Sequence, residues 1–154
     1  MDQVGKRDLK ELNLKLDKIG VQLPKKANIS FEDNFYFIDK KLSYFRFRDY
    51  ILPCLKTIYS NSVISIKMKK VTCDMGAVKF VVKGADLMRP GIVKFDEEIK
   101  SDDPVIIVDE SHSKPIAVGI SLFSGEDYKN KENGKAVKNL HYVGDSIWKE
   151  DVMH

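Results

Sequence analysis

Apolar residues recur every three or four positions near the start of the chain, which is the spacing of one face of an α-helix. Leu9, Leu12, Leu16 and Ile19 follow this spacing, with mostly polar and charged side chains between them. Gly20 comes directly afterwards, where a helix commonly ends. We therefore expect an N-terminal helix that buries one apolar stripe.

Two strand-like runs follow, at about 29–38 and 42–48. Pro53 then suits the first turn of a short helix, because an N–H has no intrahelical partner there. Asn61 and Ser62 are expected to close that helix. The first part of the chain is thus predicted to be a small α+β unit.

The second of these runs has one face of a distinct character. Phe45 and Phe47 alternate with the side chains of Tyr44, Arg46 and Arg48. Because successive side chains of a strand point to opposite faces, the pattern predicts an apolar face and a basic, aromatic one. The basic face is a candidate surface for a partner protein or RNA, and an ordinary solvated strand face is the alternative.

The pattern changes after residue 63. Short strand-like segments lie at about 64–73, 92–95, 104–109, 115–123 and 136–143. A helix is predicted over 75–83, with Asp74 as its N-cap and Gly84 as a left-handed residue after its end. The polar stretch 125–135 is expected to be a mobile loop. Short, evenly punctuated strands predict a small antiparallel barrel.

These elements predict an α+β fold with two domains, at residues 1–63 and 64–154. The first is a small α+β domain and the second is the β-barrel. No Gly-, Ser- or Pro-rich linker occurs at the boundary. We therefore expect the first domain to pack on the second through a rigid junction.

Charge is divided unevenly along the chain. Residues 1–72 contain 15 Lys or Arg and 8 Asp or Glu, whereas residues 73–154 contain 11 and 15, giving net charges of +7 and −4. The acidic residues concentrate in segment 96–110, which has seven of them and one basic residue, Lys100. This asymmetry would orient the protein on a polyanion, and solvated loops are the alternative.

Cysteine usage and the N-terminus indicate a compartment. The two cysteines, Cys54 and Cys73, form no CxxC pair, and the charged N-terminus lacks the apolar block of a secretory signal. We expect free, buried thiols and a cytoplasmic protein. No apolar run approaches the roughly 20 residues that a membrane span needs.

The sequence offers little for catalysis. His112, His141 and His154 lie far apart without the spacing of a zinc site, and no glycine-rich phosphate loop of a nucleotide enzyme is present. Cys54 and Cys73 lie on apolar segments, where inert thiols are the common case. The sequence therefore predicts no enzyme, no metal and no cofactor.

A binding surface is the remaining hypothesis. In the helix 75–83, Gly76, Lys79 and Lys83 fall on one face, and lysines neutralise phosphates while glycine allows close backbone approach. That face continues into the stretch VKGADLMRPGI, and the residues proposed to bind an anionic ligand are Lys79, Lys83, Gly84, Ala85, Met88, Arg89, Pro90 and Gly91. The alternative is that the glycines form turns and the lysines solvate the helix.

His141 and Tyr142 are two further candidates. They are adjacent on the last expected strand and must face opposite sides. One is expected to pack inward while the other stacks on a base or contacts a phosphate. A structural histidine is the alternative.

Three stretches, in their order and separation, resemble the PUA domain, an RNA-binding barrel named for pseudouridine synthases and archaeosine transglycosylases. The stretches are GAVKFVVKGADLMRPGI (76–92), PVIIVDESHSKPIAVGIS (104–121) and AVKNLHYVGDSIW (136–148). The preceding FYFIDKKLSYFRFRDYILPCLKTIYSN (35–61) is similar to the pre-PUA segment of the malignant T-cell-amplified sequence family. The compact length favours an archaeal-type member.

The resemblance implies a PUA-type pseudobarrel, no catalytic activity and a role in translation. Eukaryotic members work with the density-regulated protein, or within a ligatin-type factor, on the small ribosomal subunit and the acceptor end of transfer RNA. PUA domains bind RNA along the first helix, the loop after it, the second strand and part of the last strand. Here the resemblance maps that surface onto the candidate residues above and, through the last strand, onto His141 and Tyr142.

Three functions follow as hypotheses. The first is a non-catalytic RNA-binding protein that contacts the tRNA acceptor end or small-subunit ribosomal RNA. The second is an adaptor, recruited to the ribosome by a partner protein through the face with Tyr44, Arg46 and Arg48. The third is an accessory factor in RNA modification.

Overall fold

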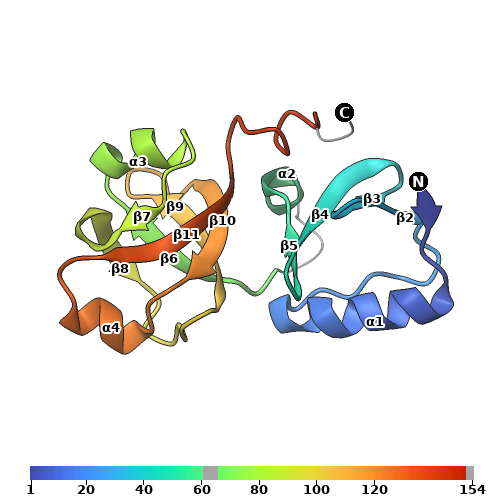
Figure 1. Ribbon diagram of the computed structural model, residues 1–154, viewed down its shortest axis with the longest axis horizontal. Helices are drawn as coiled ribbons and strands as arrows, with labels where there is room; N and C mark the ends of the chain where they lie inside the picture. The colour runs from blue at the N-terminus through green and yellow to red at the C-terminus, as the bar shows by residue number, and fades with distance from the viewer. Residues whose placement is uncertain (61–65, 152–154) are drawn as a thin grey trace. The chain divides into compact units, whose positions relative to one another are not determined.

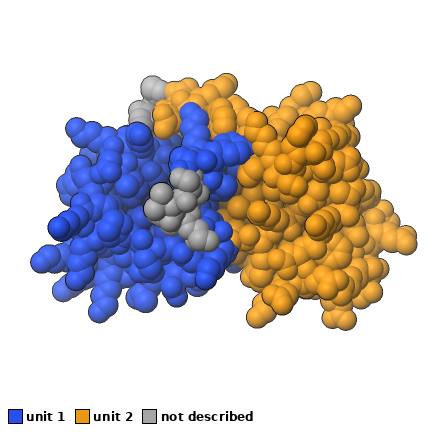
Figure 2. All heavy atoms as spheres, turned by 180° about the vertical axis from the view of Figure 1, so that it is seen from behind, with its two compact units in different colours: residues 1–67 blue, residues 68–154 orange. Residues whose placement is uncertain are grey.

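A computed structural model describes residues 1–60 and 66–151. The chain divides into two compact units, Met1–Lys67 and Met68–His154, which Figure 2 colours blue and orange. Both helices and sheets are present, so the predicted α+β class is confirmed. The predicted domain boundary at residues 63 and 64 lies outside the described residues.

The first unit begins with the predicted helix. Helix α1 spans Lys6–Leu16 and passes into a 3₁₀ turn, η1, at Asp17–Ile19. Leu12, Leu16 and Ile19 are buried, as their spacing predicts. Gly20 then takes a φ of +74°, the left-handed conformation that ends helices at low cost for glycine.

A five-stranded antiparallel sheet completes this unit, with its strands adjacent in chain order. The strands are β1 (Asp2–Gln3), β2 (Ile29–Glu32), β3 (Phe35–Ile38), β4 (Lys41–Phe47) and β5 (Tyr50–Pro53). The single strand expected at 29–38 was wrong, because a turn with Asp33 at a φ of +56° folds it into a hairpin. Acidic and amide residues accept such turns readily.

The short helix exists but begins later than expected. Helix α2 spans Leu55–Tyr59 with Cys54 at its N-cap position. Pro53 is not in its first turn, because it is the last residue of β5 and pairs with Tyr44. The residues expected to close the helix, Asn61 and Ser62, lie outside the described part of the chain.

The second unit is a six-stranded sheet that curls into a nearly closed pseudobarrel (Figure 1). Along the sheet the strands are β7 (Leu87–Met88), β11 (Lys135–Tyr142), β10 (Pro115–Ser121), β9 (Pro104–Asp109), β6 (Lys69–Cys73) and β8 (Ile92–Phe95). Pairing is antiparallel except between β6 and β9, which are parallel. A fully antiparallel barrel was therefore wrong, because the chain between these strands forms a crossover that contains α3 (Met75–Val81), β7 and β8.

The stretch expected to be a mobile loop begins with a helix instead. Helix α4 spans Gly125–Asn130 and starts with a capping box, in which Ser124 and Asp127 each accept the other's backbone N–H. Gly125 is required, since a Cβ there would collide with the carbonyl of Glu97. The polar composition of this stretch concealed a defined structure.

The barrel interior positions the site described below. Its buried side chains come from the strands and from helices α3 and α4, and include Val71, Cys73, Val81, Leu87, Ile92, Val105, Ile107, Ala117, Tyr128 and Val137. Cys54 and Cys73 are buried and form no disulfide, as expected. Burying each large apolar side chain stabilises the fold by roughly 1.5–3 kcal/mol, so α3 and β7 are fixed to the barrel by Val81 and Leu87.

Candidate nucleic-acid interface

Helix α3 is held at its start by the residue that the sequence predicts. The Asp74 Oδ1 atom accepts the Ala77 N–H at 2.7 Å, and the Glu110 side chain accepts the Met75 N–H at 3.2 Å. Both bonds satisfy N–H groups that lack partners within the helix. The orientation of α3 on the barrel is thereby set at one end.

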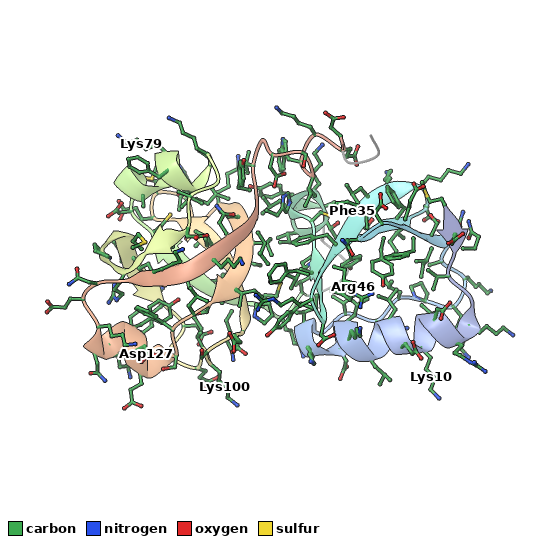
Figure 3. All side chains as sticks on the ribbon, viewed as in Figure 1. Lys10, Phe35, Arg46, Lys79, Lys100 and Asp127 are labelled. Carbon is green, nitrogen blue, oxygen red and sulfur yellow. The ribbon has the colours of Figure 1, made fainter. Side chains whose placement is uncertain are left out.

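The outward face of α3 and the turn that follows it carry two lysines and an aromatic ring. Lys79 and Lys83 are exposed, and Figure 3 shows Lys79 extending away from the barrel. The Phe80 side chain between them is 62% exposed. Within the described residues neither lysine is in an ion pair. An unpaired, exposed cation can neutralise a phosphate without first breaking a contact.

The loop after α3 presents open backbone. Gly84 has the left-handed conformation that the sequence predicts, with a φ of +98°, although α3 already ends at Val81. Lys83, Gly84 and Ala85 are exposed. A Cβ added to Gly84 would lie 3.2–3.4 Å from the Tyr142 ring. Glycine therefore permits both the turn and the close approach of this aromatic side chain.

Asn139, on β11, holds the loop after α3 in place through hydrogen bonds. Its Nδ2 donates to the carbonyls of Val81 and Ala85, both at 3.0 Å, and its backbone N–H donates to Asp86 at 2.8 Å. The Asn139 Oδ1 is buried and has no hydrogen-bond partner among the described residues. Because Asn139 belongs to a strand of the barrel, the conformation of this loop depends on the barrel as well as on the loop's own residues.

Asp86 is the charged member of this connection. Its carboxylate also pairs with Lys135 Nζ at 3.0 Å. Burial disfavours the charged form, but the Asn139 N–H and the lysine outweigh it, so the pKa of Asp86 lies below its usual value. Asp86 is therefore ionised at neutral pH and neutralises Lys135.

Two of the next candidate residues, Met88 and Pro90, lie on the surface, whereas Gly91 packs against α3. The Met88 side chain is 47% exposed, and Pro90 is exposed beside it. Gly91 has a supporting role, because a Cβ there would lie 2.9 Å from the Cβ of Ala77 on α3. Met88 thus adds an apolar contact surface, while Gly91 lets the chain pass close to α3.

Arg89 does not lie on the binding surface as predicted. Its Nε and Nη2 donate to the carbonyl of Tyr128 at 3.0 and 2.7 Å, and its Nη1 donates to the carbonyl of Ile92 at 3.0 Å. The guanidinium also lies over the rings of Phe95 and Tyr128. Because these contacts hold the side chain against the barrel, Arg89 is a structural cation.

His141 is likewise internal. Its side chain is fully buried, and its Nδ1 lies 2.9 Å from Asp145 Oδ2. Asp145 also accepts the backbone N–H groups of Tyr142 and Trp148. The prediction that this histidine contacts RNA was wrong, and its structural alternative is correct. Tyr142 is half-buried, and its ring packs beside Gly84.

Comparisons with known proteins decide the family. A PUA domain model matches residues 69–143. A Methanocaldococcus jannaschii protein is 45% identical over 148 residues, covering 93% of this chain and 89% of that one. A crystal structure from Pyrococcus horikoshii has a TM-score of 0.80 and 33% identity, covering 96% of this chain and 97% of that one.

Two eukaryotic relatives carry names that bear on function. Malignant T-cell-amplified sequence 1 of Danio rerio is 29% identical over 115 residues, covering 72% of this chain and 62% of that one. The chain contains a PUA domain and belongs to one family with the Methanocaldococcus jannaschii protein, and it is similar to malignant T-cell-amplified sequence 1. Translation machinery-associated protein 20 of Schizosaccharomyces pombe is 32% identical over 103 residues, covering 64% of this chain and 55% of that one.

Two residues of the PUA domain site were missed from the sequence. Phe80 follows Gly76 by four positions and precedes Lys83 by three, so helical spacing places it on the lysine face. That signal was available, but an aromatic residue within an apolar run suggests core. Asn139 gave no local signal, because its partners are more than 50 residues away in the sequence.

The basic face predicted before the PUA domain is only partly formed. Tyr44 is 2% exposed and lies beside Cys54 at the start of α2, and burial raises its pKa to about 12. Arg46 and Arg48 are exposed, and the Arg48 guanidinium lies 5.0 Å from the Phe47 ring centre. The expected aromatic residue is therefore not part of this face.

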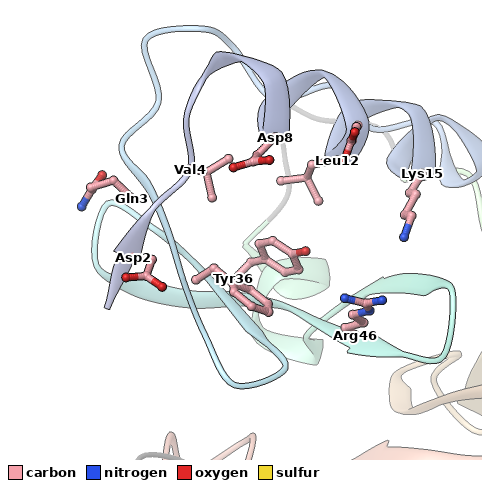
Figure 4. Close-up of a pocket in the computed structure, with 10 residues that line it drawn as sticks. Asp2, Gln3, Val4, Asp8, Leu12, Lys15, Tyr36 and Arg46 are labelled. Atoms are coloured by element: carbon pink, nitrogen blue, oxygen red, sulfur yellow. The ribbon is translucent and has the colours of Figure 1, made fainter.

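Arg46 also borders a small pocket of the first unit. The pocket has a volume of about 270 Å³, and Figure 4 shows Arg46 and Tyr36 on its sheet side and Asp8 and Lys15 on its α1 side. Burial raises the pKa of Tyr36, partly offset by Arg46. This pocket contains both acidic and basic groups and is not a basic surface.

Few groups in the described residues suit catalysis or metal binding. No cluster of three or more His, Cys, Asp or Glu there could hold a metal ion. Burial, together with nearby carboxylates, raises the pKa of Cys73 to about 11, so its thiol is protonated and unreactive at neutral pH. No helix in the same part of the chain is long and apolar enough to cross a membrane.

Proposed function

We propose that this protein is a non-catalytic RNA-binding protein of the translation machinery. Its PUA domain and its relationship to translation machinery-associated protein 20 support the proposal. The observation that carries it is the exposed Phe80 ring on the same side of the domain as the unpaired lysines Lys79 and Lys83, together with the exposed residues Gly84 and Ala85. We call this surface, residues 79–85, the α3 face.

The α3 face combines the contacts that a single RNA strand needs. Lys79 and Lys83 neutralise successive phosphates, and the Phe80 ring offers a plane for a base. Base–aromatic stacking is worth about 1–3 kcal/mol per base and does not depend on sequence. The N–H groups of Gly84 and Ala85 donate to the carbonyls of Val81 and Phe80, but the lack of a side chain at the exposed Gly84 lets a phosphate or ribose come close to the backbone.

An unpaired RNA end suits this surface better than a duplex. Bases within a helix are stacked on each other, whereas an end leaves a base face free for an aromatic ring. We therefore propose the single-stranded acceptor end of transfer RNA, or an unpaired segment of small-subunit ribosomal RNA, as the ligand.

The stacking role of Phe80 gives the experiment for this proposal. Fluorescence anisotropy compares a labelled acceptor-stem hairpin with an unpaired 3′ end and the same hairpin without that end. Phe80→Ala should weaken binding of the first RNA by about 1–3 kcal/mol, roughly 5- to 150-fold, and leave the blunt RNA less affected.

Val93→Ala is the matched control, because Val93 is an exposed apolar residue of the same unit, 53% exposed, outside the α3 face. It should bind both RNAs like the parent. Equal binding of the parent and Phe80→Ala to the RNA with the unpaired end would contradict the proposal.

The adaptor hypothesis stays a second candidate because Arg46 and Arg48 are exposed on the β4–β5 hairpin. The Arg46 Nε donates to the Arg48 carbonyl at 3.1 Å, which holds the two residues together. Arginine is enriched at binding hot spots.

Sedimentation with small ribosomal subunits separates the two functions. An adaptor should lose binding to the subunit with Arg46→Glu and Arg48→Glu, whereas a direct RNA binder should lose it with Phe80→Ala. Mass analysis of nucleosides after incubation with transfer RNA tests a modification role.

A further inference from the structure

A groove of about 870 Å³ runs along helix α1 in the first unit. One side is formed by α1 and the other by the segment 22–29, which returns beside the helix. The lining residues are Val4, Gly5, Lys6, Leu9, Lys10, Asn13, Leu14, Asp17, Gln22, Lys25, Ala27 and Ile29. We call this the α1 groove, and it has no part in the RNA contacts proposed above.

The groove is preformed by hydrogen bonds between its two sides. The Asn13 Nδ2 donates to the Leu23 carbonyl at 3.1 Å, and the Leu23 N–H returns a bond to Asn13 Oδ1 at 2.8 Å. The Gln22 Nε2 donates to the Asn13 carbonyl at 3.0 Å. Because α1 and the returning segment are fixed to each other, a ligand would not have to order them on binding.

The groove contains an exposed apolar strip. The Leu14 side chain is 68% exposed, the largest exposure among the described large hydrophobic residues, and Leu9 is partly exposed. Val4 and Ala27 extend the strip. Leucine on the outer surface of a helix is not needed for folding, and apolar surface in a groove with a polar rim marks an interaction site.

The rim of the groove is basic. Lys6, Lys10 and Lys25 line it with a single acidic residue, Asp17. In residues 1–60 and 66–151 none of the three lysines has an ion-pair partner.

We propose that the α1 groove binds an acidic amphipathic helix of a partner protein. Leucine-type side chains of the helix occupy the apolar strip, and its acidic residues face the three lysines, as in other helix-in-groove complexes. The 11 residues of α1 extend for about 16 Å, the length of three turns of a partner helix.

The lining chemistry favours protein over RNA. Single RNA strands bind surfaces on which aromatic rings stack with bases. The α1 groove is lined by aliphatic residues and has no Phe, Tyr, Trp or His among its lining residues. Lysines beside aliphatic side chains match a peptide with carboxylates and leucines.

The test uses the full-length protein and a synthetic peptide of about 18 residues, long enough to form a helix on the groove. The peptide has leucine at positions i, i+3, i+4 and i+7 and glutamate on its other face. Titration into ¹⁵N-labelled protein should shift amide signals of Lys10, Gln22 and Ala27, but not those of the α3 face. A peptide with lysine in place of glutamate should bind at least tenfold more weakly.

Two variants assign the binding to the groove. Leu14→Gln and Lys10→Glu should each weaken peptide binding about fivefold or more, about 1 kcal/mol. Both residues are exposed, so neither variant should unfold the protein. Lys18→Glu is the charge-matched control, since Lys18 is exposed on η1 and does not line the groove; it should bind like the parent.

Three results would overturn the proposal. The first is equal binding of the acidic and basic peptides, or unchanged binding by Leu14→Gln. The second is a shift of the groove amides by a single-stranded RNA oligonucleotide, which would make the groove an RNA site. The third is a dimer in analytical ultracentrifugation that Leu14→Gln dissociates, which would make a second copy the occupant.

Discussion

Arg89 shows that a basic residue in a glycine-rich bend can be part of the fold rather than of the binding surface. Its three donor atoms fix the carbonyls of Tyr128 and Ile92, which belong to α4 and β8. A variant that reverses its charge would therefore damage the barrel. Lys79 and Lys83 alone are suitable for testing RNA binding by charge reversal.

Arg89→Met should destabilise the protein by about 2–4 kcal/mol, because it removes charge-assisted hydrogen bonds and leaves carbonyls without these partners. Urea denaturation at neutral pH measures this change. Lys79→Met is the comparison, and as an exposed lysine without an ion pair it should alter stability by less than about 0.5 kcal/mol. Parental stability in Arg89→Met would show that the guanidinium contacts contribute nothing.

Asp145 gives the fold a dependence on acid pH. Burial disfavours its charge, but bonds from His141 and from the N–H groups of Trp148 and Tyr142 outweigh this, so the pKa of Asp145 is lowered in the folded state. The carboxylate therefore stabilises the protein above its unfolded-state pKa, near 4, and this contribution disappears as pH falls through the lower folded-state value.

Asp145→Asn should cost about 1.5–3 kcal/mol at neutral pH, since bonds to a charged acceptor become bonds to a neutral one. It should also lessen the loss of stability between about pH 5 and pH 2. Denaturation curves across this range test both effects. An unchanged acid slope in the variant would mean that other carboxylates, not Asp145, set the acid sensitivity.

At the scale of elements, the local sequence pattern predicted helices and caps that depend on residues close together in the chain. The stripe of Leu12, Leu16 and Ile19 predicted α1, and Asp74 predicted the start of α3. Helix α3 ends at Val81, two residues before the predicted end at residue 83. The hairpin turn at Asp33 and the capping box at Ser124 were present in the sequence but were overlooked within longer runs. These errors were errors of interpretation.

Contacts between segments that are far apart in the sequence could not be predicted from the local pattern of residues. The parallel pairing of β6 with β9 joins strands more than 30 residues apart, and no spacing in the sequence reports it. Tyr44 was predicted to lie on an exposed strand face, because the alternation of side chains along a strand cannot reveal that the start of α2 covers this residue. His141 is buried and Arg89 is partly buried, and both positions depend on partners that other segments supply.

Asn139 links β11 to the α3 face and allows a test of this connection. Asn139→Asp keeps the size of the side chain but removes the donors to Val81 and Ala85, and it places a second carboxylate near Asp86. We expect a loss of about 1–3 kcal/mol in stability and weaker RNA binding.

The control for Asn139→Asp is Lys135→Gln. It removes an ion pair at the surface, where the side chain of Lys135 is half-exposed, and such pairs contribute less than about 1 kcal/mol. Thermal unfolding and RNA anisotropy are measured on both variants. If they behave alike, the Asn139 bonds do not hold the loop.

At the scale of the whole molecule, the two compact units carry different surfaces. The second unit carries the α3 face, and the first carries the α1 groove. We propose that residues 1–63 and 64–154 are separate domains that divide RNA binding and protein binding between them. A fragment of residues 64–154 should unfold cooperatively in urea and keep the RNA affinity of the full chain within about threefold; a fragment without a cooperative transition would contradict this division.

The central claim is that the α3 face binds RNA, and affinity as a function of salt tests it most directly. The Lys79→Glu/Lys83→Glu variant is titrated with the acceptor-stem hairpin from low to moderate salt. The control is a single charge reversal, Lys100→Glu, at the distant lysine labelled in Figure 3. Loss of two phosphate contacts should weaken binding at least tenfold and reduce the slope of log K against log[salt] by about 1.4. Lys100→Glu should match the parent within about twofold. A double variant with the parental affinity and slope would show that RNA, if bound, lies elsewhere.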